Sequence, residues 1–100
     1  MQGHYAAEFD REQGSTEADW TRCLPGAVRE HRLEQPAPGI ARVHIGGGWL
    51  DLRWQPLPPR QIALVRLPRL AVHYRFEAVD DALRQTFMRY FDLFMQRGGG

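Results

Sequence analysis

The middle of the chain alternates between hydrophobic and polar residues, as half-buried β-strands do. The alternation covers residues 40–45, 49–55 and 70–77. Gly46, Gly47 and Gly48 separate the first two segments, and glycine adopts the positive φ angles of a tight turn without steric cost. The pattern therefore predicts a hairpin followed by a further strand.

Residues 61–67 form a nearly continuous apolar run, which is typical of a central strand. Pro56, Pro58 and Pro59 precede the run, and proline cannot donate to a β-ladder. Pro68 and Arg69 then form a short connection to the strand at 70–77. We therefore expect four strands.

Two segments carry helical patterns. The longer one runs from about Asp80 to Arg97, where an aspartate can cap the first turn. Its apolar residues recur at helical spacing: Val79, Leu83, Phe87, Tyr90, Phe91 and Phe94. A shorter helix begins near Ser15 and ends at Pro25 and Gly26. Residues 27–34 fit either a strand or a continuing turn, and 35–39 read as a loop.

These elements predict an α+β fold: a four-stranded antiparallel sheet, a long C-terminal helix on one sheet face, and a short N-terminal helix. Residues 15–100 form a single domain. Residues 1–14 are polar and lack periodicity, so we expect a disordered segment there.

Composition fits a small cytoplasmic protein. Cys23 is the one cysteine, so no disulfide can form within the chain, as expected in a reducing compartment. The N-terminus lacks the basic and apolar regions of a signal peptide, and no apolar stretch is long enough for a membrane span. We expect no membrane association. All 13 cationic residues other than histidine are arginine, which is typical of a GC-rich bacterial genome.

Candidate motifs for chemistry have plainer structural interpretations. The Gly98–Gly100 tail resembles those of ubiquitin-like and sulfur-carrier proteins only in its last residues, because those tails follow a strand and this one follows a helix. The glycines at 46–48 precede a strand, whereas a phosphate loop precedes a helix. His4, His31, His44 and His73 lack metal-ligand spacing. We therefore expect no enzymatic activity, cofactor or metal.

The C-terminal helix has an apolar arc wider than one sheet face can cover. Met88, Phe91, Leu93 and Met95 are the candidate interface residues on this helix. Three covers remain open from the sequence: the N-terminal helix with Trp20, a second subunit in a homodimer, or an unknown partner protein.

The polar side of the strands is the second candidate surface. Arg42, His44, Trp49, Arg53 and Arg75 are expected there, and residues 36–100 carry more arginines than acids. Arginines beside an exposed tryptophan suit phosphate contacts and base stacking. The sequence thus predicts a small protein–protein interaction module that is able to self-associate. The alternative is binding of an anionic ligand or single-stranded nucleic acid.

Overall fold

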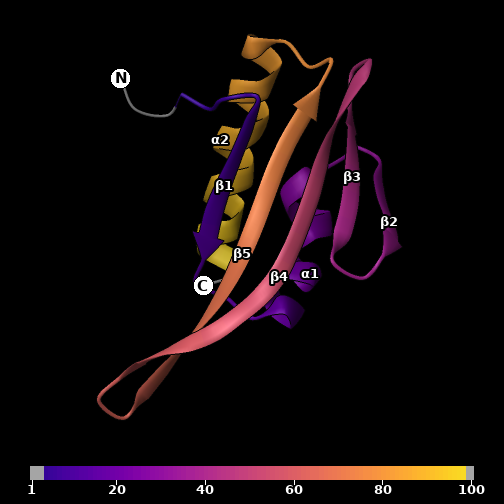
Figure 1. Ribbon diagram of the computed structural model, residues 1–100. Helices are drawn as coiled ribbons and strands as arrows, with labels where there is room; N and C mark the ends of the chain where they lie inside the picture. The colour runs from indigo at the N-terminus through magenta and orange to yellow at the C-terminus, as the bar shows by residue number, and fades with distance from the viewer. Residues whose placement is uncertain (1–3, 99–100) are drawn as a thin grey trace.

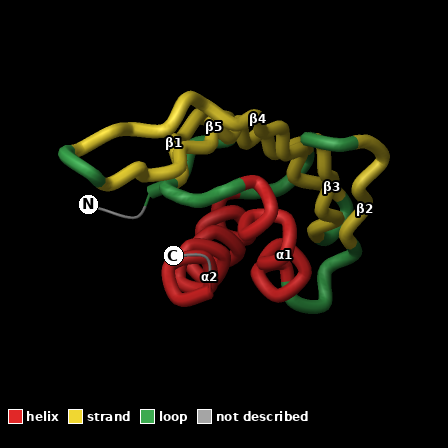
Figure 2. The backbone as a smooth tube through the Cα atoms, turned by 90° about the horizontal axis from the view of Figure 1, so that it is seen from below, coloured by secondary structure: helices red, strands yellow, loops and turns green. Residues whose placement is uncertain are grey.

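The computed structural model describes residues 4–98 and has a two-layer α+β architecture. Five strands form one antiparallel sheet, in the spatial order β1-β5-β4-β3-β2. They are β1 (Glu8–Gln13), β2 (Leu33–Ala37), β3 (Ile40–Ile45), β4 (Gly48–Ile62) and β5 (Val65–Glu77). Helices α1 (Glu17–Val28) and α2 (Asp81–Gly98) both cover one face of the sheet, and the opposite face is open (Figures 1 and 2).

The predicted class, an antiparallel α+β fold with a helix near each end, is confirmed, but the strand count was wrong. The fifth strand, β1, lies in the segment for which no element was expected. It pairs with β5 at the edge of the sheet, from Glu8 opposite Arg75 to Gln13 opposite Leu70. Only Phe9 is hydrophobic among its six residues, and its ring stacks on that of Tyr74, with centroids 4.6 Å apart.

The apolar run at 61–67 is not a central strand, and that prediction was wrong. The chain turns at Ala63 and Leu64, so the run forms the end of β4 and the start of β5. The segment at 35–39 was also misjudged, because residues up to Ala37 belong to β2.

Helix α1 continues to Val28, past the predicted end at Pro25. Thr16 caps its start, with the hydroxyl accepting from the Asp19 amide at 3.1 Å. Gly26 permits a close approach to α2, because a Cβ at this position would lie 2.2 Å from Cζ of Phe94.

The core lies between the sheet and the two helices. The largest fully buried side chains include Trp20 from α1, Leu52 from β4, Tyr74 from β5 and Phe91 from α2. The Trp20 and Phe91 rings meet edge to face, with centroids 5.9 Å apart. Helix α1 therefore covers the flank of α2 that the sheet leaves free.

An ion pair at the other flank ties β1 to α2. Arg11 donates to both carboxylate oxygens of Asp92, at 2.7 and 2.9 Å. Tyr5 donates to the same carboxylate through its hydroxyl. Both charged side chains are mostly buried, so this bidentate pair is protected from solvent screening.

Candidate functional site

The helix residues expected at an interface lie mainly in the core. Met88, Phe91 and Met95 are buried by the chain's own sheet and α1. Of the three covers left open by the sequence, the structure supports the first, the N-terminal helix. Leu93 remains exposed on the outer side of α2, at 52%. The four residues therefore do not form one accessible surface.

The open sheet face brings together the arginines and Trp49 that the sequence placed there. Arg42 donates to both carboxylate oxygens of Asp51, at 2.8 and 3.2 Å. Its guanidinium also lies 4.4 Å from the centre of the Trp49 ring. The bond to Asp51 raises the pKa of Arg42. This arginine is thus already engaged by an acid and an aromatic ring.

Other basic side chains on the open face also have acidic neighbours. Nε2 of His44 lies 2.9 Å from a carboxylate oxygen of Glu34, and Arg75 lies 3.5 Å from Glu77. Within residues 4–98, Arg53 makes no ion pair that would neutralise it. The face therefore offers an anion one unpaired arginine instead of a cluster.

His73 lies between two carboxylates from the edge strand. Its Nδ1 is 2.7 Å from Asp10 and its Nε2 is 2.8 Å from Glu8. Both ring nitrogens can donate only when the imidazole is protonated. The hydrogen bonds to Asp10, and then to Glu8, accordingly raise the pKa of His73. Among the described residues, no group of three or more histidine, cysteine or acidic side chains converges as a metal site.

The most distinctive surface lies beyond the sheet, where the β4–β5 hairpin continues alone. We call residues 57–69 the arm. β1 pairs with β5 only from Leu70 onward, and β3 pairs with β4 only as far as Arg53. Figure 1 shows the arm projecting well past both helices. Every residue from 58 to 67 is exposed.

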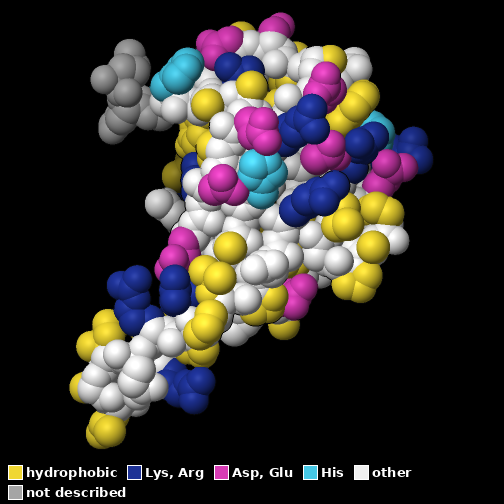
Figure 3. Space-filling model, in the orientation of Figure 1, with side chains coloured by type: hydrophobic (Ala, Val, Ile, Leu, Met, Phe, Trp, Pro, Cys, Tyr) yellow, Lys and Arg dark blue, Asp and Glu magenta, His cyan; other side chains and the backbone are white. Residues whose placement is uncertain are grey.

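Large hydrophobic side chains gather at the end of the arm. The exposed fractions are 53% for Ile62, 97% for Leu64, 54% for Val65 and 41% for Leu67. We call these four residues the apolar tip. Figure 3 shows hydrophobic side chains at the end of this projection and arginines toward its base. Residues 57–69 contain three arginines and no acid.

The turn at the end of the arm lacks the glycine or asparagine that two-residue hairpin turns usually contain. It has two residues, Ala63 and Leu64, between the paired Ile62 and Val65. Ala63 has a φ of 55°, a conformation that favours glycine or asparagine. A residue with a Cβ there costs about 1 kcal/mol. Neither local conformation nor solubility accounts for an alanine and an exposed leucine at this turn.

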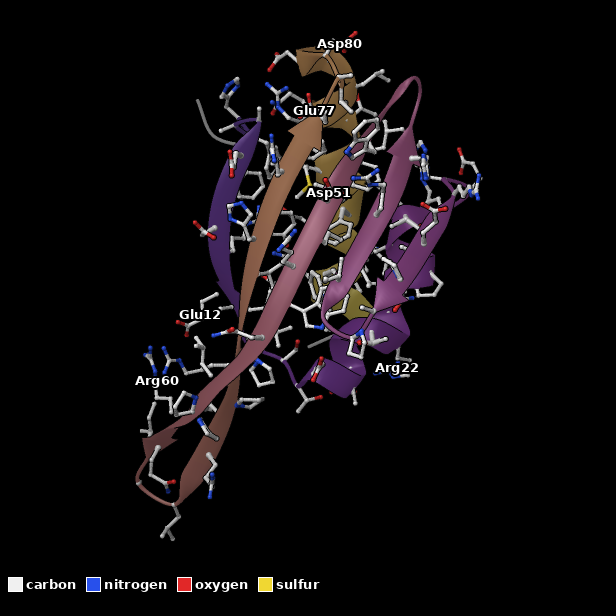
Figure 4. All side chains as sticks on the ribbon, turned by 45° about the vertical axis from the view of Figure 1, so that its right-hand side comes forward. Glu12, Arg22, Asp51, Arg60, Glu77 and Asp80 are labelled. Atoms are coloured by element: carbon white, nitrogen blue, oxygen red, sulfur yellow. The ribbon has the colours of Figure 1, made fainter. Side chains whose placement is uncertain are left out.

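The base of the arm is held by Glu12 of β1. Arg69 donates to both of its carboxylate oxygens, at 2.9 and 3.1 Å, and Arg60 lies 3.9 Å away. Figure 4 shows Glu12 and Arg60 close together where the arm leaves the sheet. The hydrogen bond from Arg69 lowers the pKa of Glu12. This carboxylate thus links the base of the arm to β1 and partly offsets the positive charge of the arm.

A shallow hollow of about 240 Å³ lies between the arm and the middle of the sheet. Residues of three adjacent strands line it, among them Asp10 of β1, Arg53 and Gln55 of β4, and Ala71 and His73 of β5. Ala71 and Gln55 are opposite each other in the ladder. The small Ala71 side chain leaves a depression between longer neighbours.

Prolines are the sequence signal for the arm, and hydrophobic periodicity does not take them into account. Pro58, Pro59 and Pro68 lie on both strands of a hairpin, and proline is confined to strand edges and bulges. Both strands therefore had to lack neighbours at these positions. The pairing register shifts between Leu57 and Arg60, where the two prolines stand.

The fold and this surface define the protein as a small two-layer α+β domain with a projecting β-ribbon. Comparison with known proteins finds no matching family model and no similar curated protein. None of the helices within residues 4–98 has the length and apolar character needed to cross a membrane.

Proposed function

We propose that the protein is a non-catalytic module that binds another protein chain through its arm. The observation that carries the proposal is the apolar tip, at the end of a ribbon that Glu12 of β1 contacts only near its base. Contiguous exposed apolar side chains mark interaction sites. A lone two-stranded hairpin is only marginally stable in water, so a partner would supply the packing that the arm lacks.

Contact through side chains is favoured over addition of a strand. Residues 57–69 expose backbone edges on both sides, since β3 and β1 pair with the hairpin only nearer its base. Pro58 and Pro59 interrupt the β4 edge, and Pro68 interrupts the β5 edge. Proline has no N–H to donate, which protects such edges from pairing with other strands. The partner would therefore recognise the apolar tip and the arginines.

Binding of an anionic ligand or single-stranded nucleic acid on the open face remains the weaker alternative. Arg53 is its main support. Arg42, His44 and Arg75 each have an acidic partner in the chain, and an anion would have to displace it.

The test compares the wild-type protein with two single variants as bait in extracts of its source cells. Leu64→Asp places a charge at the apolar tip, and Leu93→Asp is the matched control, an exposed leucine on α2. We expect the wild type and Leu93→Asp to retain the same protein, and Leu64→Asp to lose it. A second copy of this chain counts as such a protein.

Circular dichroism and thermal unfolding should be unchanged in both variants, because both side chains are exposed. Retention that is equal for all three baits would contradict the proposal. An endogenous copy of the chain and a different protein are distinguished by mass spectrometry.

A further inference from the structure

We infer that Glu12 restrains the arm in the free protein and competes with the partner for two arginines of the arm, Arg60 and Arg69. We call the contacts of Glu12 with these two arginines the latch. The inference rests on the proposed function, because it concerns the regulation of the docking arm. Figure 4 shows the latch where the hairpin leaves the sheet.

The ladder between β4 and β5 is interrupted at the base of the arm. The last regular pair before the interruption is Leu57 with Arg69, and pairing resumes with Arg60 opposite Leu67. The residues within this irregular step are all prolines: Pro58, Pro59 and Pro68. Proline has no N–H to donate to a ladder. Register shifts of this kind bend a ribbon, so we expect the arm to pivot at this step.

Side-chain contacts span the irregular step. Nη1 of Arg69 donates to the carbonyl oxygen of Pro58 on β4, at 3.2 Å. Nε and Nη2 of Arg69 donate to the two carboxylate oxygens of Glu12 on β1, at 2.9 and 3.1 Å. Arg60, on the far side of the step, lies 3.9 Å from the same carboxylate. Glu12 therefore connects the sheet to the hairpin on both sides of the pivot.

Few other contacts restrain the arm. β1 pairs with β5 only from Leu70 onward, and β3 pairs with β4 only as far as Arg53. Every residue from 58 to 67 is exposed, so packing against the rest of the chain contributes little. An ion pair at an exposed position shifts an equilibrium by about fivefold at most. The latch can therefore hold the arm in the free protein and still open when a partner binds.

The latch occupies basic residues on the same side of the arm as most of the apolar tip. Side chains alternate along a strand, and residues opposite each other in a ladder share a side. Arg69 and Arg60 accordingly share their side with three aliphatic residues: Ile62, Val65 and Leu67. Residues 57–69 contain no acid of their own. Release of Glu12 therefore frees two arginines beside an aliphatic surface.

This surface specifies the chemistry of the partner. A carboxylate of the partner can form the same bidentate pair with Arg69 that Glu12 forms in the free protein. Its charge complements that of the arm, and an apolar surface beside it would cover the tip. We therefore expect the partner to present an acidic side chain next to an apolar patch. Displacement of Glu12 by this side chain would couple docking to release of the arm.

The first experiment measures amide residual dipolar couplings in the wild type, Glu12→Ala, Arg69→Ala and Glu8→Ala. Residues 60–67 report on the arm, and residues 40–54 report on the sheet. We expect one alignment to fit both regions in the wild type. Glu12→Ala and Arg69→Ala should reduce the couplings of the arm by about twofold, because open states become populated.

Glu8→Ala is the matched control for the latch variants. Glu8 lies on the same strand and, like Glu12, is exposed, but its carboxylate contacts His73 instead of an arginine of the arm. The couplings of the arm should therefore be the same in this variant as in the wild type.

The second experiment uses the same variants as bait, beside Leu64→Asp. Glu12→Ala should retain up to about fivefold more of the protein whose capture depends on Leu64, because the competing carboxylate is absent. Arg69→Ala should retain less of it, because this variant removes a contact with the partner together with the latch. Glu8→Ala should retain as much as the wild type.

Equal arm couplings in the wild type and both latch variants would overturn the inference and leave the proposed function standing. Unchanged or reduced capture by Glu12→Ala would also overturn it, since Glu12 would then not compete with the partner. Capture that does not depend on Leu64 would overturn the proposed function itself, whatever the couplings show.

Discussion

The two halves of the β4–β5 hairpin have similar hydrophobic content and opposite environments. Near the helices, Leu50, Leu52 and Tyr74 are fully buried. In the arm, Ile62, Val65 and Leu67 are exposed, although they belong to the same two strands. The difference lies in the neighbours, because the helices and the flanking strands end before the arm begins. Buried and exposed parts of one hairpin can therefore have similar hydrophobic content.

The largest expected contrast between the two regions is in stability. Phe91→Ala empties a fully buried site between α1 and the sheet, and we expect a loss of about 3–5 kcal/mol in the free energy of unfolding. Leu64→Ala removes an exposed side chain and should change it by less than about 0.5 kcal/mol. Urea denaturation at low protein concentration measures both.

A comparable loss for Leu64→Ala at low concentration would mean that the arm is packed within the monomer. The contrast between the regions would then be wrong.

A smaller effect is expected at the turn of the arm. Ala63→Gly relieves the positive φ angle, so the hairpin end should become more stable by up to about 1 kcal/mol. The global unfolding energy should change little, because the arm adds few contacts to the core. Amide hydrogen exchange at Val65 should slow by severalfold, and exchange at Leu52 should not change. Faster exchange at Val65 would show that the alanine is not strained.

The smallest effect is the pH dependence at His73. Its pKa is raised above the ordinary 6.5 by Asp10 and Glu8. Protonated His73 therefore stabilises the folded state fully below pH 6.5, and this contribution is lost as pH rises through the higher folded value. Solvent screens the partly exposed cluster, so the change should stay below about 1 kcal/mol.

Thermal unfolding from pH 6 to pH 9 should show a decline in wild type that is reduced in His73→Gln. Equal pH profiles for the two proteins would remove the link between His73 and the edge strand.

The helix α2 and the strand β3 could be predicted because their apolar residues repeat with one period over their whole length. The edge strand β1 could not, because its residues EFDREQ are almost all polar. It forms where β5 supplies a free edge and where Asp92 receives Arg11. Both partners are about 60 to 80 residues away in the chain, beyond the reach of a local pattern.

For the candidate surfaces too, the sequence predicted local features but not the contacts between residues distant in the chain. Alternation correctly indicated that Arg42 and Trp49 share the open face, since parity within a strand is a local property. It could not indicate that Asp51 would pair with Arg42, or that Glu34 would lie beside His44. Nor could the wide apolar arc of α2 reveal its cover, because Trp20 reaches Phe91 only after α1 has packed beside it.

By itself, the sequence determined the α+β class, the long C-terminal helix and the alternation of the central strands, because these depend on periodicity over short distances. Tertiary structure alone decided which apolar residues are covered. The run at 61–67 lies outside the core because no helix or strand covers it. Met88 and Met95 lie inside the core because α1 and the sheet cover them. Burial depends on neighbours that are distant in the chain. The hydrophobicity of a residue shows that burial is favourable but does not identify the element that covers it.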